Sequence, residues 1–422
     1  MIDYRYTSRK LWKILLAGLL ALSVAGCGKE NDMDRTETGG DGATGKMGLS
    51  LQLRSPLSLD AGTDTRVAVQ ELTITDVWVV QFSMSGSQVS VKNYANAEGD
   101  TEDTKQIIWD SASGFYQVKT GSNDFWNEDS QFYIITNAGK DHTGLTDFRT
   151  LAESTPASAT IATLQSLLKE LSEDESVSTA ESGLLTAGPV DFIKKESGGL
   201  NTVAALIAHM KRAYARITVR YSVGSAAFPD ATFTPATLTV MNVPKVIAFY
   251  ERAGATAGNY PSIAESVYAT NFVESVQLYP VTDNSVDFSQ DTPLTFYMAG
   301  NLRGIGVSGT AQGKNLAANG PLDNDVTGNT RSLKGCTCIR LAGRYKYNGN
   351  PATGDSGDVG VTYAFYLGGN LINDYNIERG KAYTLQITIG SVNSADVRVS
   401  VTDGNVSVFD QVTVVPEINV DI

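Results

Sequence analysis

Arg216-Ile217-Thr218-Val219-Arg220-Tyr221-Ser222-Val223 decides the fold of this chain. Apolar and polar residues alternate through it, which is the period-two pattern of a β-strand with one face buried. Short segments of the same kind continue to the C-terminus, separated by loops rich in Gly and Asn. They lie at residues 237–240, 275–279, 294–298, 336–341, 361–367, 383–389 and 397–401. Many short strands at this spacing predict a β-sandwich or a β-barrel.

The chain before Lys211 also contains strand patterns, but it adds a helix. Met47, Leu49, Leu51 and Leu53 alternate with polar or small residues, and residues 67–82 and 131–136 form further apolar strand regions. Residues 158–171 carry apolar side chains at helical spacing and predict a packing helix. We therefore predict a mainly β protein with two domains. Residues 47–211 form the N-terminal domain with a small helical insertion, residues 212–404 form the C-terminal domain, and residues 405–422 form a tail.

Composition excludes several classes of function. The 422 residues include 46 Asp and Glu against 33 Lys and Arg, and this net charge of −13 argues against nucleic-acid binding. Two His and three Cys leave little material for a His-based triad or a zinc site. His142 and His209 have no nucleophile motif near them, and Asp323-Asn324-Asp325 lacks the remaining ligands of a calcium loop. We expect no enzyme activity, no metal and no cofactor.

The N-terminus predicts an export signal. Four basic residues precede the apolar run 14–22, and Val24-Ala25-Gly26-Cys27 follows it as a lipobox. Residues 1–26 are then a lipoprotein signal peptide and Cys27 carries the lipid, although an ordinary signal peptide with a chance cysteine is the alternative. Cleavage before Cys27 leaves 45 acidic residues against 29 basic ones, a net charge of −16. Residues 27–46 read as a flexible tether, whose acidic start could also be a surface-export signal.

Two further groups of residues have both a structural and a functional interpretation. Cys336 and Cys338 would share one face of a strand, and we interpret them as buried small hydrophobic residues, with a redox pair as the alternative. Aromatic residues near positions 109–126 could stack on sugar rings, which suggests a surface glycan-binding lipoprotein, although aromatic residues of β-proteins are more often in the core. These residues are Trp109, Phe115, Tyr116, Phe125 and Trp126.

Several motifs together resemble the fimbrillins, also called FimA-like proteins or type V pilins, of gut and oral anaerobes. The motifs are the lipobox, the strand-loop-Arg-strand unit that contains Arg66, Phe132-Tyr133-Ile134-Ile135-Thr136-Asn137-Ala138-Gly139, Lys211-Arg212-Ala213-Tyr214-Ala215-Arg216-Ile217-Thr218-Val219, Phe296-Tyr297-Met298 with Asn301-Leu302-Arg303-Gly304, and Tyr366-Leu367-Gly368 with Asn376-Ile377-Glu378-Arg379-Gly380-Lys381-Ala382-Tyr383-Thr384-Leu385. No single motif is specific, but their order extends over most of the chain. One departure is Gly300, where the family usually has an acidic residue before the Asn of a turn.

The resemblance implies two transthyretin-like β-sandwich domains and assembly into a surface pilus that supports adhesion. The precursor would be a palmitoylated lipoprotein of the outer membrane. A trypsin-like, Arg-specific protease would then remove the first strand, and the C-terminal strand of another subunit would fill the groove. The implied partners are other pilin subunits, including accessory tip and anchor subunits, together with that protease.

The sequence offers a residue set for each part of this process. The displaced strand would contain Met47, Leu49, Leu51 and Leu53. Cleavage would follow Arg66 in a polar Gly-containing loop, with Arg54 as second choice because Pro56 lies close behind it. The donor strand would contain Val412, Val414, Ile418, Val420 and Ile422.

Alternatives remain for the tail and for the position in the pilus. The tail could pair within its own C-terminal domain, or residues 406–414 could do so while only the last residues are donated. Because the chain has both a removable strand and a donor tail, a stalk subunit is favoured over a tip or an anchor subunit.

Overall fold

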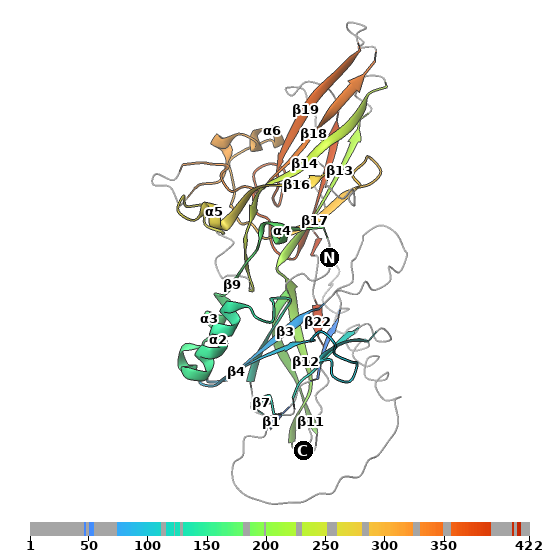
Figure 1. Ribbon diagram of the computed structural model, residues 1–422. Helices are drawn as coiled ribbons and strands as arrows, with labels where there is room; N and C mark the ends of the chain where they lie inside the picture. Colours follow the sequence, from blue (N-terminus) through green and yellow to red (C-terminus); the bar gives the residue numbers. More distant parts are fainter. Residues whose placement is uncertain are drawn as a thin grey trace, which may run out of the picture. The chain divides into compact units, whose positions relative to one another are not determined.

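A computed structural model describes most of the chain after the predicted tether, and it is mainly β (Figure 1). The described residues are 46–47, 50–54, 74–110, 115–121, 123–126, 130–179, 186–197, 200–224, 230–250, 260–280, 287–323, 330–348, 356–389, 407–408 and 412–414. The predicted signal peptide, Cys27, Leu49 and Arg66 lie outside these residues, as do Ile418, Val420 and Ile422. No helix in the described part is both long and apolar enough to cross a membrane.

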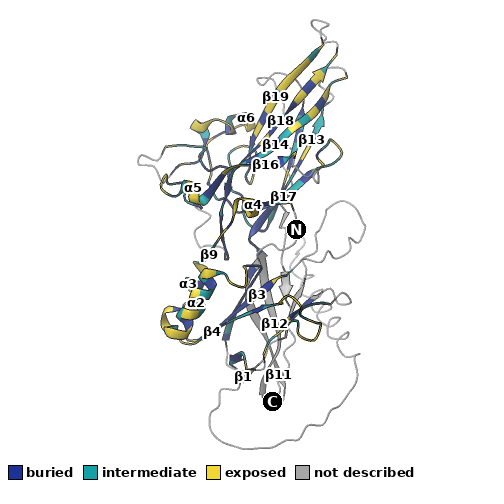
Figure 2. Ribbon diagram, in the orientation of Figure 1, coloured by how far each residue is buried: buried dark blue, intermediate teal, exposed yellow. Residues whose placement is uncertain are grey.

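The N-terminal part is built on one antiparallel sheet, which has nine strands among the described residues, in the order β4-β3-β8-β11-β12-β22-β2-β6-β5. Its strands are β2 (Ser50–Arg54), β3 (Asp76–Ser83), β4 (Val89–Ala95), β5 (Ile107–Asp110), β6 (Phe115–Lys119), β8 (Ser130–Thr136), β11 (Thr186–Ser197), β12 (Leu200–Arg212) and β22 (Val412–Val414). β1 (Lys46–Met47) and β7 (Phe125–Trp126) form a separate pair. β3 is buried along its whole length, as Figure 2 shows, because β4 and β8 flank it and a hydrophobic core covers it.

The helical insertion differs from the prediction for residues 158–171. Among the described residues the longest helix is α2 (Thr143–Ser154), which the sequence analysis did not predict. Within the predicted range only α3 (Ile161–Gln165) is an α-helix, preceded by the 3₁₀ turn η1 (Pro156–Ser158). The helix ends early because β9 (Leu168–Glu170) pairs with β15 (Val246–Ala248) in an antiparallel ladder.

The C-terminal part consists of two sheets that enclose a common core. The first sheet orders its strands β10-β17-β13-β20-β21 and the second orders them β16-β14-β18-β19. Their bounds are β10 (Val177–Ser178), β13 (Tyr214–Val223), β14 (Thr232–Pro244), β16 (Phe272–Tyr279), β17 (Leu294–Ala299), β18 (Cys338–Tyr347), β19 (Gly357–Tyr366), β20 (Lys381–Ile389) and β21 (Ser407–Val408). Short helices α4 (Glu173–Ser176), α5 (Tyr268–Asn271) and α6 (Ala311–Lys314) and the 3₁₀ turn η3 (Ala317–Asn319) connect them.

The alternation of residues 216–223 is confirmed in β13. Ile217, Val219 and Tyr221 are buried, whereas Arg220 is exposed. The buried side chains of β13 join those of β14 and β18 in one hydrophobic cluster, so the two sheets pack face to face. The predicted β-sandwich architecture is therefore present in this half of the chain.

Gly300 has a local reason for replacing an acidic residue. A side chain at this position would begin 3.2 Å from the carbonyl oxygen of Ile377 and 3.3 Å from the backbone nitrogen of Arg379. The next residue, Asn301, exchanges two backbone hydrogen bonds with Ile377, and its buried amide donates to Gly335 O and Thr337 Oγ1. The close approach of residues 377–379 leaves little room for a carboxylate.

The predicted boundary near Lys211 falls where the two cores share residues. Tyr214, Tyr297 and Ala382, which belong to C-terminal strands, pack in the hydrophobic cluster of the N-terminal part. Arg379 donates to the backbone carbonyls of Arg212, Ala248 and Phe249 at 2.8–3.2 Å. This guanidinium group therefore links the predicted junction to the 248–249 turn.

Candidate strand-exchange site

The predicted displaced strand lies beside two short strands of the N-terminal part. In β1, Lys46 pairs with Trp126 and Met47 pairs with Phe125. β2 runs antiparallel to β6, from Ser50 opposite Lys119 to Arg54 opposite Phe115. The backbone of the predicted strand therefore occupies the edges of both β6 and β7.

The described part of the tail also reaches this sheet. In β22, Val412 pairs with Met210 and Val414 pairs with Ala208 of β12. On its other side Val414 pairs with Leu53 of β2. β21, earlier in the tail, pairs with β20 of the C-terminal part. Figure 1 shows β22 in red among the blue and green strands of the N-terminal sheet, so the tail segment lies next to the strand that it is expected to replace in another subunit.

Two polar side chains hold β7 from the side of β3 and β4. The fully buried amide of Gln81 in β3 binds both backbone groups of Trp126: Nε2 donates to its carbonyl oxygen at 2.9 Å, and Oε1 accepts from its nitrogen at 3.3 Å. Tyr94 in β4 donates its hydroxyl to Asp124 Oδ2 at 2.8 Å. Burial, and next the hydrogen bond to Asp124, raises the pKa of Tyr94 well above its usual 10.0, so the hydroxyl stays a donor at neutral pH.

The carboxylate of Asp124 collects further contacts next to β7. Oδ2 also accepts from the backbone nitrogen of Gly121 at 2.6 Å, and Oδ1 lies 3.7 Å from Lys92 Nζ. Ser90 Oγ donates to the backbone oxygen of Asp124 at 3.1 Å. The turn before β7 is therefore fastened to β4 by three side chains of that strand, Ser90, Lys92 and Tyr94.

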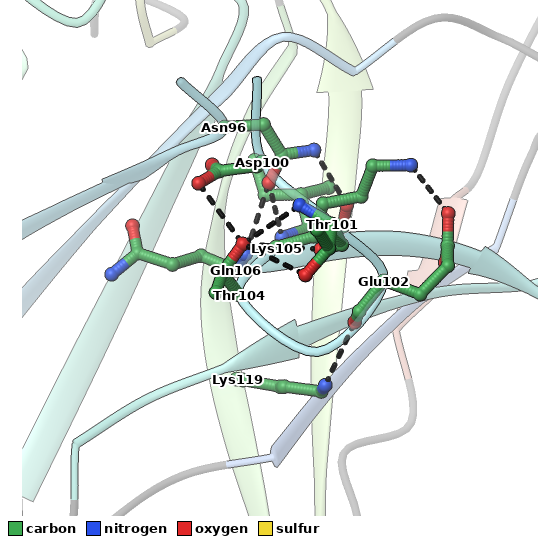
Figure 3. A network of polar contacts seen from close by, with 9 residues as sticks. Asn96, Asp100, Thr101, Glu102, Thr104, Lys105, Gln106 and Lys119 are labelled. Carbon is green, nitrogen blue, oxygen red and sulfur yellow. Dashed lines mark hydrogen bonds and ion pairs between the residues drawn. The ribbon is translucent and has the colours of Figure 1, made fainter. Parts of the chain in front are cut away.

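The loop between β4 and β5 provides a third attachment (Figure 3). Asn96 Oδ1 accepts from the backbone nitrogens of Gln106 and Ile107 at 3.0 and 2.9 Å, and Nδ2 donates to Ile107 O at 2.7 Å. Gln106 Oε1 accepts from Ala95 N at 3.2 Å. The start of β5 is therefore tied to the end of β4, although these two strands are the opposite edges of the sheet.

Polar contacts within the same loop keep its shape. Asp100 accepts from Ala97 N at 2.6 Å and from Thr104 Oγ1 at 3.2 Å. Half-buried Lys105 pairs with exposed Glu102 at 2.5 Å, and Lys119 Nζ of β6 donates to Glu102 O at 3.5 Å. These contacts lie on the surface and do not involve the backbone of β5.

Gln81, Asn96 and Asp124 are not among the candidate site residues predicted from the sequence. Gln81 was detectable as an uncharged polar residue in an apolar strand, since a buried amide must find hydrogen-bond partners. Asn96 and Asp124 stand in polar segments, where their types are common and carry no such signal.

The other candidate residues from the sequence, Cys336, Cys338 and His142, have contacts typical of structural residues. Cys336 and Cys338 are free and buried, as predicted, and burial raises their pKa to about 12 and about 11. His142 accepts from Leu145 N and begins α2. Among the described residues no group of three or more His, Cys, Asp or Glu could hold a metal ion.

Among the aromatic residues considered for glycan stacking whose burial the structure describes, two are buried and two are half-buried. Phe125 is 1% exposed and packs edge-to-face on Phe132, and Tyr116 is 5% exposed. Trp109 and Trp126 are half-buried, and Trp109 packs on Tyr116 with ring centroids 4.8 Å apart. These contacts favour the core interpretation for Tyr116 and Phe125.

Comparisons with known proteins give one family match and several distant structures. Residues 296–387 match the model described as Domain of unknown function (DUF4906), which covers less than half of the chain. A comparison with curated proteins finds no match. A candidate cell adhesion protein from Bacteroides eggerthii has a TM-score of 0.42 at 15% identity, covering 90% of this chain and 97% of its own. The tip fimbrial protein Mfa3 from Porphyromonas gingivalis, with a C-terminal truncation, has a TM-score of 0.42 at 12% identity, covering 84% and 99%. At these scores the likeness decides neither fold nor function.

Proposed function

We propose that this chain is a stalk subunit of a surface pilus, exported as a lipoprotein on Cys27 and supporting adhesion. A protease removes the first strand by cutting after Arg66, and the C-terminal strand of another subunit takes its place. Each half is a transthyretin-like sandwich in this proposal, and the role is not enzymatic. Tip and anchor subunits are the alternatives within the same kind of fibre.

One observation carries the proposal: β22 and β2 are neighbours in one sheet, with β6 on the far side of β2. Loss of β2 would open the edges of β22 and β6, and unpaired strand edges are templates for strand addition. Five aliphatic side chains of the tail, at about 1.5–3 kcal/mol each, would contribute roughly 7–15 kcal/mol before ordering costs. Register is well specified, because a slip of one residue turns apolar side chains away from the core.

The place of Arg54 supports Arg66 as the cleaved residue. Arg54 ends β2, and its backbone pairs with Phe115. Proteases cut exposed loops more readily than backbone held in a ladder. A cut after either residue would release all of β1 and β2, so the ladder position of Arg54 is what favours Arg66.

The test is to treat the mature protein with a trypsin-like protease and follow polymer formation by electron microscopy and SDS-resistant ladders. We expect wild type and Arg54→Ala to polymerise. Arg66→Ala should stay monomeric with an unchanged circular dichroism spectrum. Polymerisation of Arg66→Ala would move the cleavage site elsewhere.

Truncation of the tail tests its role as donor strand while leaving the acceptor groove intact. A chain lacking residues 416–422 should be cut normally, bind one wild-type donor and then stop growth. Continued growth of this chain alone would show that the tail is not the donor strand. An intact chain that is never cut on cells would instead behave as an anchor.

A further inference from the structure

We propose that Gln81, Asn96 and Asp124 are positioning residues that keep β5, β6 and β7 in place when the first strand is absent. The proposal rests on the proposed function, because only strand removal gives this attachment a use. The set of bonds that these residues form with β5, Trp126 and β4 is here called the seam.

The need for the seam follows from the order of the sheet. β6 has β2 on one side and β5 on the other, and β5 is the last strand of the sheet. Without β2, the pair β5–β6 would have no ladder bond to any other strand that the structure describes. β7 would likewise lose its partner β1. A two-stranded hairpin is at best marginally stable in water, so it needs another attachment to remain an ordered acceptor edge.

The seam supplies that attachment from strands that stay. Gln81 lies in β3, and Asn96 directly follows β4. Both residues are C-terminal to the proposed cleavage point, so cleavage does not remove them. Asn96 makes one hydrogen bond to Gln106, just before β5, and two to Ile107, its first residue, and Gln81 binds both backbone groups of Trp126. Asp124 joins β7 to β4 through Tyr94 and Ser90.

Apolar packing supports the same attachment. Phe125 of β7 is 1% exposed and contacts Phe132 of β8, with ring centroids 5.6 Å apart. β8 lies in the ladder beside β3 and also stays after cleavage. An edge held in this way is ready for an incoming strand, and preorganisation lowers the entropy cost of binding.

A double-mutant cycle in the uncut full-length chain tests the seam without any protease or donor strand. Leu51→Pro and Gln52→Pro each weaken β2, because proline donates no hydrogen bond to a ladder. Both variants are made, one at a time, since successive backbone amides of a strand point to opposite neighbours and only one of them faces β6. Each is combined with Asn96→Ala, and hydrogen exchange is measured for peptides covering residues 107–119.

We expect each single change to alter exchange in residues 107–119 less than threefold, while Asn96→Ala combined with the effective proline accelerates it at least tenfold. Lys105→Ala is the matched control, because it removes an exposed ion pair of the same loop and leaves β5 untouched. Combined with the same proline, it should behave like the proline alone. Asn96→Asp keeps both acceptor bonds, so the exchange rate of residues 107–119 in this variant should lie between those of wild type and Asn96→Ala.

Two results would contradict the proposed role of the seam. One is a proline variant that fails to fold, or that alone accelerates hydrogen exchange in residues 107–119 as much as the double variant does. The other is purely additive behaviour of the two changes. Neither result depends on the proposed function, which has its own test. The proposed function fails if a labelled peptide of residues 411–422 does not bind the protease-cut chain while a peptide of residues 46–54 does.

Discussion

His142 shows how one side chain makes the stability of this protein depend on pH. Its Nδ1 accepts from the backbone nitrogen of Leu145 at 3.2 Å, which satisfies a free donor at the start of α2. Burial, and next the charge of Lys169, lowers the pKa of His142 below its usual 6.5, while the nearby Asp76 acts in the opposite direction. Only the neutral imidazole can accept this bond.

Acidification should therefore cost stability through His142. The unfolded chain takes up the proton first, so this stabilisation is complete above about pH 6.5 and is lost as the pH falls through the lowered pKa of the folded state. We expect the free energy of unfolding, measured in urea, to fall more between pH 7 and pH 5 in wild type than in His142→Asn, which keeps an acceptor but does not titrate. Equal losses in the two proteins would contradict this. His142→Ala should cost about 0.5–2 kcal/mol at pH 7.

At the scale of elements, alanine substitution of two glycines in neighbouring strands should have different effects on the free energy of unfolding. A side chain at Gly343 in β18 would begin 2.4 Å from both the ring of Phe233 and the carbonyl oxygen of Thr234. At Gly360 in β19 nothing lies within 4 Å. Gly343→Ala should lower the free energy of unfolding by about 1–3 kcal/mol, as overpacking does. Gly360→Ala should be neutral or stabilising by up to about 1 kcal/mol, because alanine loses less entropy in a strand.

Urea unfolding of the two alanine variants against wild type checks this pair of predictions. Retained m-values would show that the native state stays compact in each variant. A Gly343→Ala protein as stable as wild type would mean that β18 can move away from Phe233, and the close contact with β14 would then not constrain the sheet.

The elements differ in how far the sequence predicts them. β13 was predictable because its alternation reports its burial directly, and β8 because a short continuous apolar run is typical of a strand buried on both faces. The end of α3 was not, since it depends on β9 pairing with β15, which lies more than 70 residues further along the chain. α2 was missed although Leu145, Phe148 and Ala152 mark one buried face, because His142 is an uncommon helix-capping residue.

The candidate site was predictable only in part, for the same physical reason. Alternation predicted strands in the first segment and in the tail, and the described parts include β2 and β22, but nothing local indicates that β22 lies between β12 and β2. The bonds from Gln81 to Trp126 and from Tyr94 to Asp124 join positions 45 and 30 residues apart. Side-chain contacts of this range depend on the closed fold and leave no periodic signal.

At the scale of the whole molecule, the two halves are joined through their strands as well as through the chain. β10, which precedes Lys211 in the sequence, pairs with β17 in the C-terminal sheet, and β9 pairs with β15. β21 and β22 then return the chain from β20 to the N-terminal sheet. The first strand and the described tail are therefore neighbours in one sheet, so that loss of the first strand would directly affect the tail.

This return of the tail should be intramolecular before cleavage. Deleting residues 411–422 removes β22 and should accelerate hydrogen exchange at residues 208–210 of β12, while β13 is unaffected. Deleting only residues 416–422 keeps β22 and should leave that exchange unchanged. Since the tail is tethered to its own sheet, its effective concentration exceeds that of tails from other copies in dilute solution, and protection should not vary with protein concentration. Protection that rises with concentration would mean that uncut chains already exchange tails, and cleavage would then strengthen assembly instead of starting it.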